Sequence, residues 1–298
     1  MSSIDHEPLV GIGIPTYNRA SSLKRAIESV LAQDYSNLEL VISDDASEDA
    51  TATLCEEFRK RDGRVRYIRH QTNQGITTNF VEVFKRSRGD FYMWLADDDW
   101  LDRSYVSQCL QVLLEQPDHV LVCGKAKYFE GEKFLFEEDA INLPQDSGRH
   151  RVLAYYRQVT VNGILYGVMR REQLEKVPPM QNILGDDWLL IASIVFAGKA
   201  RTLESVSINR SFEGSSKNME ALALRYGLSR LLSKIPHLRI AIAAFKDIAW
   251  ASTAYESMGK LSRLSLGGKA FAIVSWRFCV RARIRLRTRL RYWLRPFS

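Results

Sequence analysis

The sequence predicts an α/β fold, in which helices flank a mainly parallel, Rossmann-like β-sheet and a helical, arginine-rich appendage follows. Short apolar runs alternate with amphipathic stretches of about a dozen residues, as in βαβ units. After about residue 215 the strand-like runs stop. At 298 residues the chain is also longer than one hydrophobic core usually supports. We therefore expect one domain over residues 1–215 and a helical region over residues 216–298.

The first hundred residues contain four apolar runs, and each of them ends in polar residues. The run at 9–15 is followed by apolar residues at spacings of three and four from Leu23 to Leu31, which is the spacing of one helix face. The other expected strands are 38–43, 65–68 and 90–96, and the helices between them contain Leu54 and Phe58, then Phe80 and Phe84.

The rest of the chain gives shorter signals. The first domain is expected to continue with a helix over 105–114, a strand over 119–122, an irregular stretch to about residue 145, an apolar helix over 189–196 and a last strand over 200–208. The appendage is expected to contain helices over 219–232, 240–255 and 260–291.

The composition is that of an ordinary folded protein. Hydrophobic residues make up 46% of the chain, charged residues 26% and aromatic residues 10%, which excludes a disordered, fibrous or multi-spanning protein. The four cysteines are far apart, so we expect reduced, mostly buried thiols and neither a zinc site nor a disulfide scaffold. No secretory signal and no apolar run of roughly 20 residues is visible. We expect a cytoplasmic protein, peripheral on the inner face of the cytoplasmic membrane.

The positive charge of the chain, formally +7, is concentrated near its C-terminus. Eleven cations lie between Gly259 and Ser298, whereas the last acidic residue is Glu256. Within 281–291 every second residue is arginine, so a strand would place these arginines on one face and a helix would scatter them. Arginine interleaved with aromatic residues and leucine suits an anionic membrane surface. The alternatives are a solvated, disordered end and nucleic-acid binding; we favour membrane docking and expect no nucleic-acid partner.

Three consecutive aspartates, Asp97, Asp98 and Asp99, follow the fourth apolar run. Like charges at about 4 Å repel by roughly 1 kcal/mol in water and by more when partly buried. Mg²⁺ or Mn²⁺ would remove this repulsion, because such cations bind one or two carboxylates together with phosphate oxygens. The alternative is a solvated loop that caps the helix beginning near Asp102. We favour a divalent cation, because ligands bind at the carboxyl ends of strands in such sheets.

Two further acidic pairs each allow a structural and a functional interpretation. Asp44-Asp45, followed by Ser47, is either a turn with a helix N-cap or a carboxylate pair that accepts hydrogen bonds from a nucleotide's base or ribose. Asp186-Asp187 precedes an apolar helix and, in isolation, is most often a helix-start pair. Spacing alone does not decide between these interpretations.

Five segments together resemble the glycosyltransferase family 2 enzymes of the bacterial surface-polysaccharide type, which have the GT-A fold. The segments occur in the family's order and at its usual intervals, over roughly residues 8–215. They are VGIGIPTYNR (10–19), LVISDDAS (40–47), NQG (73–75), GD (89–90) leading to LADDD (95–99), and GDDW (185–188). Each segment alone is a weak signal, whereas five in order are a strong one.

The resemblance implies which residues bind the nucleotide. Asp44 matches the aspartate that contacts the nucleobase, with Asp45 beside it. Arg210 weakly resembles part of the loop near the diphosphate, where this chain lacks the family's histidine. The other matching residues are Pro15, Thr16, Tyr17, Asn18, Arg19 and Asn73.

The resemblance also implies a metal ligand and a catalytic base. Asp97 and Asp99 match the two ends of the Asp-x-Asp motif, the first directed toward the ribose and the second toward the metal. Because all three positions are aspartate, the register is open by one residue, and Asp98 takes either role. Asp187 matches the base, with Asp186 in place of the family's glutamate.

We therefore expect a metal-dependent, inverting glycosyltransferase. It would move a hexosyl or deoxyhexosyl group from a nucleoside diphosphate sugar to a hydroxyl of a lipid-linked glycan acceptor, in surface polysaccharide or O-antigen biosynthesis. The sequence leaves open the donor sugar, its base, the acceptor and the oligomeric state. The alternative function is a noncatalytic glycan- or membrane-binding protein with a degenerate transferase domain. Retention of Asp44, Asp97, Asp99 and Asp187 argues against this alternative.

Overall fold

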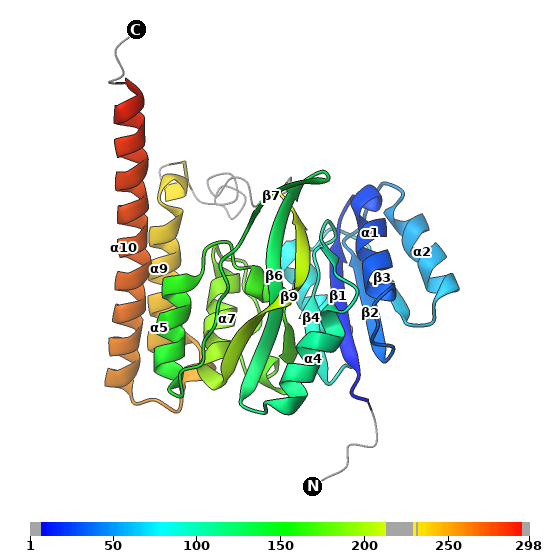
Figure 1. The fold of residues 1–298 in the computed structure, drawn as a ribbon, viewed down its shortest axis with the longest axis horizontal. Helices are drawn as coiled ribbons and strands as arrows, with labels where there is room; N and C mark the ends of the chain where they lie inside the picture. The colour runs from blue at the N-terminus through cyan, green and yellow to red at the C-terminus, as the bar shows by residue number, and fades with distance from the viewer. Residues whose placement is uncertain (1–6, 213–228, 231, 294–298) are drawn as a thin grey trace.

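The computed structural model describes residues 7–212, 229–230 and 232–293, and of residues 232 and 278–293 it describes the backbone alone. A nine-stranded sheet lies at its centre, with the strand order β3-β2-β1-β4-β8-β6-β9-β5, and β7 pairs with β6 (Figure 1). The strands are β1 (Val10–Thr16), β2 (Leu38–Asp44), β3 (Val65–Arg69), β4 (Phe91–Trp94), β5 (Trp100–Leu101), β6 (His119–Glu130), β7 (Lys133–Glu137), β8 (Val168–Arg170) and β9 (Lys199–Ser211).

Half of the sheet is parallel and half is mixed. Strand β1 pairs in parallel with β2 and β4, and β2 pairs in parallel with β3. The short strand β8 then enters between β4 and β6 and is antiparallel to both, whereas β6 and β9 are parallel. The predicted α/β class is confirmed. The parallel character holds for the first four strands, which come from consecutive βαβ units, and β8 introduces the opposite direction because it follows a short turn, η1 (Gly163–Tyr166).

Every helix expected within residues 1–212 is present. The two outer helices α1 and α2 lie beside β1 to β3, and α5, α7, α9 and α10 stand side by side at the other end of the molecule (Figure 1). The helices of the first domain are α1 (Ala20–Leu31), α2 (Thr51–Arg61), α3 (Ile76–Arg86), α4 (Tyr105–Glu115), α5 (Gly148–Gln158), α6 (Arg171–Leu174) and α7 (Asp186–Ala197). Strands β1 and β2 are buried along their whole length, so their apolar runs form the centre of the core.

The stretch predicted to be irregular contains regular structure. Strand β6 continues to Glu130 and folds back into β7, although only its first part is continuously apolar. Helix α5 has a polar sequence, yet its Arg151 is only 5% exposed. This side chain donates hydrogen bonds to the carbonyl oxygens of Val195 (2.7 Å) and Phe196 (2.8 Å) at the end of α7. A buried arginine that caps another helix explains why hydrophobic periodicity does not reveal α5.

The C-terminal region packs on α5 and α7. Helix α9 (Pro236–Lys246) passes through a π-helical turn (Asp247–Ala251) and a 3₁₀ turn (Thr253–Tyr255), and α10 (Lys260–Trp293) follows. Arg263 of α10 donates to the carbonyl oxygens of Ile248 and Ser252, and Arg277 donates to that of Tyr156 in α5. The helices expected over 240–255 and 260–291 are thus present, the first of them broken after Lys246. The expected helix over 219–232 and the expected boundary at 215/216 lie outside the described residues, apart from a short 3₁₀ turn (Leu232–Lys234).

Two further expectations concern the cysteines and the membrane. Cys55, Cys109 and Cys123 are buried and form no disulfide, as predicted. None of the helices in the described part of the chain is both long enough and apolar enough to cross a bilayer.

Candidate functional site

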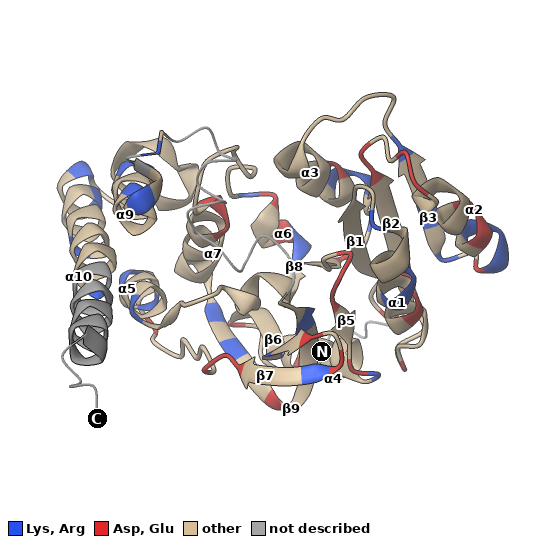
Figure 2. Ribbon diagram, turned by 90° about the horizontal axis from the view of Figure 1, so that it is seen from above, with Lys and Arg blue, Asp and Glu red and all other residues tan. Residues whose placement is uncertain are grey.

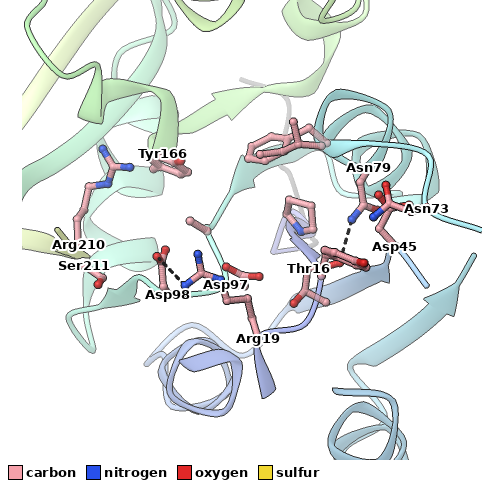
Figure 3. A pocket seen from close by; sticks show the side chains of 15 residues that line it. Thr16, Arg19, Asp45, Asn73, Asn79, Asp97, Asp98, Tyr166, Arg210 and Ser211 are labelled. Carbon is pink, nitrogen blue, oxygen red and sulfur yellow. Dashed lines mark hydrogen bonds and ion pairs between the residues drawn. The ribbon is translucent and has the colours of Figure 1, made fainter. Parts of the chain in front are cut away.

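A cavity of about 420 Å³ opens at the carboxyl ends of β1 and β4 (Figure 3). This volume lies within the range of small-molecule sites in proteins. We call it the main cavity. Its lining combines the polar ends of the strands with an apolar wall: Pro15, Thr16, Tyr17, Arg19, Asp45, Asn73, Ile76, Asn79, Phe80, Ala96, Asp97, Asp98, Tyr166, Arg210 and Ser211.

The loop after β1 contributes four of its five predicted residues to this lining. Asn18 is the exception, and it shapes the loop. Its backbone is left-handed, with φ at 53°. Its N–H donates to the Ser47 hydroxyl (2.9 Å), and its side-chain oxygen accepts from the Glu48 N–H (2.7 Å). Asn18 therefore ties the loop after β1 to the loop after β2.

Asp44 and Asp45 have different surroundings. Asp44 is fully buried, and its oxygens accept from the Ser47 N–H (2.8 Å) and the Tyr67 hydroxyl (2.7 Å). Asp45 lines the main cavity and accepts from the backbone N–H groups of Gln74 (2.7 Å) and Gly75 (2.9 Å). Of these two predicted residues, Asp45 lines the main cavity, whereas Asp44 is buried and does not line it.

The turn at residues 73–75 and the start of α3 form the apolar side of the cavity. Asn73 lines the cavity as predicted, beside the exposed Ile76 and the partly buried Phe80. Asn79 is a site residue that the sequence did not reveal. Its amide donates to the carbonyl oxygens of Thr16 (3.3 Å) and Ser43 (2.9 Å), whereas its buried Oδ1 has no hydrogen-bond partner among the described residues. A ligand donor in the main cavity would satisfy this oxygen.

Asp97 and Asp98 line the main cavity next to Arg19 (Figure 3). Burial, and then the charge of Asp98, raise the pKa of Asp97 to about 7. Asp98 lies 3.9 Å from the Arg19 guanidinium. The repulsion expected from the sequence is therefore present between Asp97 and Asp98, and a divalent cation at their carboxylates would offset it.

Asp99, unlike Asp97 and Asp98, does not line the main cavity and is 1% exposed. It forms an ion pair with Arg210 (2.9 Å) and accepts from the Ser211 N–H (3.0 Å). Arg210 is itself buried, donates to the Tyr128 hydroxyl (3.0 Å), and lies 4.5 Å from the centre of the Tyr166 ring. The carboxylate predicted to face the metal thus anchors β9 and places a guanidinium at the wall of the main cavity.

Asp187 is the second residue of α7 and is held by a chain of hydrogen bonds. The Asn162 side chain donates to Asp187 Oδ2 (2.8 Å), and its oxygen accepts from the Tyr155 hydroxyl (2.7 Å). Asn162 has a left-handed backbone, with φ at 63°. Its loop is fixed by the buried Glu138 carboxylate, which accepts from the N–H groups of Asn162 (3.1 Å) and Gly163 (2.9 Å).

These contacts act on the protonation of Asp187. Burial raises its pKa, whereas the hydrogen bond from Asn162 and the charge of Arg210 oppose this rise. Asp187 therefore has two features of a general base, namely an orientation fixed by a hydrogen bond and a raised pKa.

A divalent cation is compatible with the main cavity but would need oxygens from a ligand. No three His, Cys, Asp or Glu side chains gather as a metal cage anywhere in the described ranges. Asp98, with Asp97 beside it, supplies the one or two carboxylates that Mg²⁺ or Mn²⁺ usually takes when phosphate oxygens complete its coordination. The donor set therefore fits a metal–diphosphate complex.

Sequence reasoning missed Asn79, Tyr166, Asn162 and Glu138, and it gave Arg210 only a weak role. Their side chains reach the site from segments far apart in the chain, as when Arg210 meets Asp99 across 111 positions. One signal was present: a polar Asn79 sits on the apolar face of an otherwise amphipathic helix.

Comparison with known proteins places these residues in a known family. The sequence model of the family described as "Glycosyl transferase family 2" matches residues 12–177. The chain is 27% identical over 167 residues to EpsH of Bacillus subtilis (strain 168), which covers 56% of this chain and 48% of EpsH. The chain thus spans about half of the length of that relative.

Another relative and a solved structure match most of the chain. A Campylobacter jejuni (strain ATCC 700819) protein named GalNAc(5)-diNAcBac-PP-undecaprenol beta-1,3-glucosyltransferase is 26% identical over 258 residues, which cover 84% of this chain and 81% of that protein. The mannosyltransferase PcManGT from Pyrobaculum calidifontis, solved with GDP-Man and Mn²⁺, superposes with a TM-score of 0.57 and 18% identity. It covers 97% of this chain and 84% of its own, and at this identity the likeness concerns the fold.

Proposed function

Because the chain belongs to glycosyl transferase family 2 and has its GT-A fold, we propose that it transfers a sugar from a nucleoside diphosphate sugar to a hydroxyl group. The observation that carries this proposal is that Arg210, which lines the main cavity, is also within electrostatic reach of Asp187. A donor in the cavity and an acceptor at Asp187 would meet at this place.

The donor nucleotide occupies the main cavity. Its base lies against Ile76 and Phe80 and within reach of Asp45 and Asn79, and its diphosphate lies toward Asp98 and Arg19. Bound at Asp98, a divalent cation would supply the positive charge that a departing diphosphate needs. The buried Arg210 adds a fixed positive charge on the same side of the cavity. GDP-Man and Mn²⁺ in PcManGT support this class of ligand.

Asp187 acts as the general base of a single displacement. Its Oδ1 accepts the proton of the acceptor hydroxyl while that oxygen forms a bond to the anomeric carbon. The bond from this carbon to the diphosphate oxygen breaks, and its electron pair leaves with the nucleoside diphosphate. One displacement from the side opposite the leaving group inverts the anomeric carbon. A positioned base typically contributes 10²- to 10⁴-fold to the rate.

The acceptor is a lipid-linked glycan, and the protein works at the cytoplasmic face of a membrane. The undecaprenol in the name of the Campylobacter relative supports such an acceptor. The cations in 281–291 support contact with anionic lipid. Helix α10 includes this segment in its backbone, so the arginines belong to a helix and not to a strand. Surface polysaccharide biosynthesis is the pathway that we propose.

The first test is thermal unfolding of the full chain with UDP, GDP, dTDP or CDP, each with and without Mn²⁺. A ligand at 100 times its dissociation constant stabilises the folded state by about 2.7 kcal/mol, which raises the Tm by several degrees. We expect one nucleotide to do so, and only with metal. Asp98→Asn should abolish the metal-dependent rise, and the exposed Asp34→Asn should keep it. No rise with any nucleotide would favour the noncatalytic alternative.

The second test separates catalysis from binding. Asp187→Asn should keep the nucleotide-induced rise in Tm, because Asp187 does not line the main cavity. The same variant should fail to restore surface glycan in a strain that lacks the gene, whereas Asp34→Asn should restore it. Full restoration by Asp187→Asn would remove Asp187 as the base.

A further inference from the structure

A second cavity, of about 330 Å³, lies between α9 and the segment 181–189 that leads into α7. We call it the α9 groove. Its walls are largely apolar and include Ile183, Leu189 and Ile242. Trp250 lines it beyond the end of α9 and exposes 59% of its surface. Figure 2 shows α7 standing between α9 and the strands, and the linings of the α9 groove and the main cavity share no residue.

Two cations border the α9 groove. Arg239 and Lys246 are two helical turns apart on α9, so they share one face of the helix. Both are exposed, and neither forms an ion pair with any residue in the described ranges. Unpaired cations beside an apolar wall match a ligand that has an anionic group and an apolar part.

One carboxyl group also lines the α9 groove. Asp247 is 8% exposed, and its buried Oδ2 has no hydrogen-bond partner among the described residues. Burial raises the pKa of Asp247 to about 7, against the opposing charge of Arg263. At neutral pH this group is therefore only partly charged, and the lining keeps a positive balance. Its free oxygen is available to a hydroxyl of a ligand.

The α9 groove begins beside the proposed base. Asp186 and Asp187 are consecutive in α7, and consecutive helix residues point about 100° apart. Asp187 is turned toward Asn162, whereas Asp186 accepts from the N–H of Gln181 (2.8 Å), a residue that lines the α9 groove. Through Gln181, the lining of the α9 groove is thus hydrogen-bonded to the residue that precedes the proposed base.

We propose that the α9 groove binds the phosphorylated lipid end of the acceptor, with the phosphates at Arg239 and Lys246 and the start of the lipid chain against Ile242 and Trp250. This assignment rests on the proposed function, because it gives the acceptor a path to Asp187. It also separates the two substrates: the nucleotide enters from the β1 side of α7 and the lipid from the α9 side.

The test uses the full chain, saturated with Mn²⁺ and a nucleoside diphosphate so that the main cavity is filled. Farnesyl diphosphate is titrated into it by calorimetry. We expect saturable binding that becomes at least about tenfold weaker in Arg239→Glu/Lys246→Glu, which is about 1.4 kcal/mol. Farnesol, which lacks the diphosphate, and inorganic diphosphate, which lacks the lipid chain, should also bind at least about tenfold more weakly than farnesyl diphosphate.

A matched control reverses two charges elsewhere. Lys60→Glu/Lys133→Glu changes two exposed lysines outside both cavities and should bind farnesyl diphosphate within about twofold of the unmodified chain. Equal binding by the Arg239/Lys246 variant, or by inorganic diphosphate, would overturn the proposal. The proposal would also be overturned if the chain does not bind farnesyl diphosphate and forms a dimer that Trp250→Glu dissociates. The α9 groove would then be the contact with a second copy of the chain.

The same variants distinguish this proposal from the proposed function. Arg239→Glu/Lys246→Glu should keep the metal-dependent rise in Tm with nucleotide. A chain that shows this rise but does not bind farnesyl diphosphate would refute the lipid site alone. A chain that binds farnesyl diphosphate without responding to any nucleotide would refute the donor site alone.

Discussion

Replacing Arg210 with methionine is expected to destabilise the folded protein, because it leaves the Asp99 carboxylate buried without its counter-charge. The two side chains are 2.9 Å apart, and Asp99 is 1% and Arg210 9% exposed in this pair. Removing one partner of a buried ion pair typically costs about 3–5 kcal/mol. In a protein of this size that lowers the Tm by roughly 6 °C or more. Chemical unfolding of Arg210→Met measures the loss directly.

The loss should also depend on pH. Burial raises the pKa of Asp99 to about 6 even though Arg210 opposes the shift. Without Arg210 this pKa rises further above the value of about 3.9 in the unfolded chain. The folded state then binds a proton that the unfolded state has released, so stability falls as the pH rises. We expect the difference in the free energy of unfolding between Arg210→Met and the unmodified chain to increase from pH 6 to pH 8. Adding Asp99→Asn to the Arg210→Met variant should make this difference smaller.

The comparison between Asp98 and Asp99 decides which carboxylate holds the metal. Asp98→Asn should leave the Tm nearly unchanged, because its one ion pair among the described residues, 3.9 Å to the half-exposed Arg19, is worth at most about 1 kcal/mol. Asp99→Asn should lower the Tm as Arg210→Met does. The reasoning is refuted if Asp99→Asn unfolds within about 1 °C of the unmodified chain and loses the effect of Mn²⁺, since Asp99 would then be the metal ligand.

Three further predictions follow from single contacts. Asn162→Ala should lower kcat by roughly tenfold, as expected for a hydrogen bond to a charged group. It should also move the acidic limb of the pH–rate profile to higher pH, because the Asn162 amide lowers the pKa of Asp187. An unchanged pH–rate profile would show that Asn162 does not have this role. Burial raises the pKa of Asp186 to about 8, so the folded state holds a proton that the unfolded state loses above about pH 4. The unmodified chain should therefore lose stability between pH 5 and pH 8. Asp186→Asn should reduce this loss, as measured by urea titrations at each pH. Gly13→Ala would place a Cβ 2.0 Å from the Tyr92 hydroxyl and should cost about 1–3 kcal/mol; an unchanged Tm would show that Tyr92 moves aside.

The sequence predicted the fold where local patterns and packing agree. Strands β1, β2 and β4 are buried along apolar runs, and β1, β2 and β3 are each followed by a helix, so periodicity revealed them. Strand β7 was missed although it pairs with β6 across a short turn, and most of its residues are exposed. Helix α5 was missed because its stability comes from long-range contacts. Arg151 can be buried because carbonyl oxygens at the end of α7 accept its hydrogen bonds. The sequence of α5 contains no pattern that indicates these partners.

The sequence located two acidic clusters that the structure brings to the main cavity. In both the loop after β2 and the aspartate cluster, it could not show which carboxylates line the cavity and which are buried behind it. Asp44 is held by Tyr67 and Asp99 by Arg210, and each partner comes from a different strand. Side-chain direction in such loops depends on partners that only the assembled sheet brings near.

In the membrane attachment that we propose, helix α10 would supply a direction as well as an affinity. Its 34 residues form one continuous rod from the body to the arginine-rich segment, about 50 Å long at 1.5 Å per residue. A flexible tether would let the body tumble above a surface, whereas a rod packed against α5 and α9 fixes the angle at which the body is presented. Shortening the rod by one residue would rotate everything beyond the deletion by about 100°. In the proposed attachment, the length of this helix would therefore set both the distance and the orientation of the candidate site relative to the membrane surface.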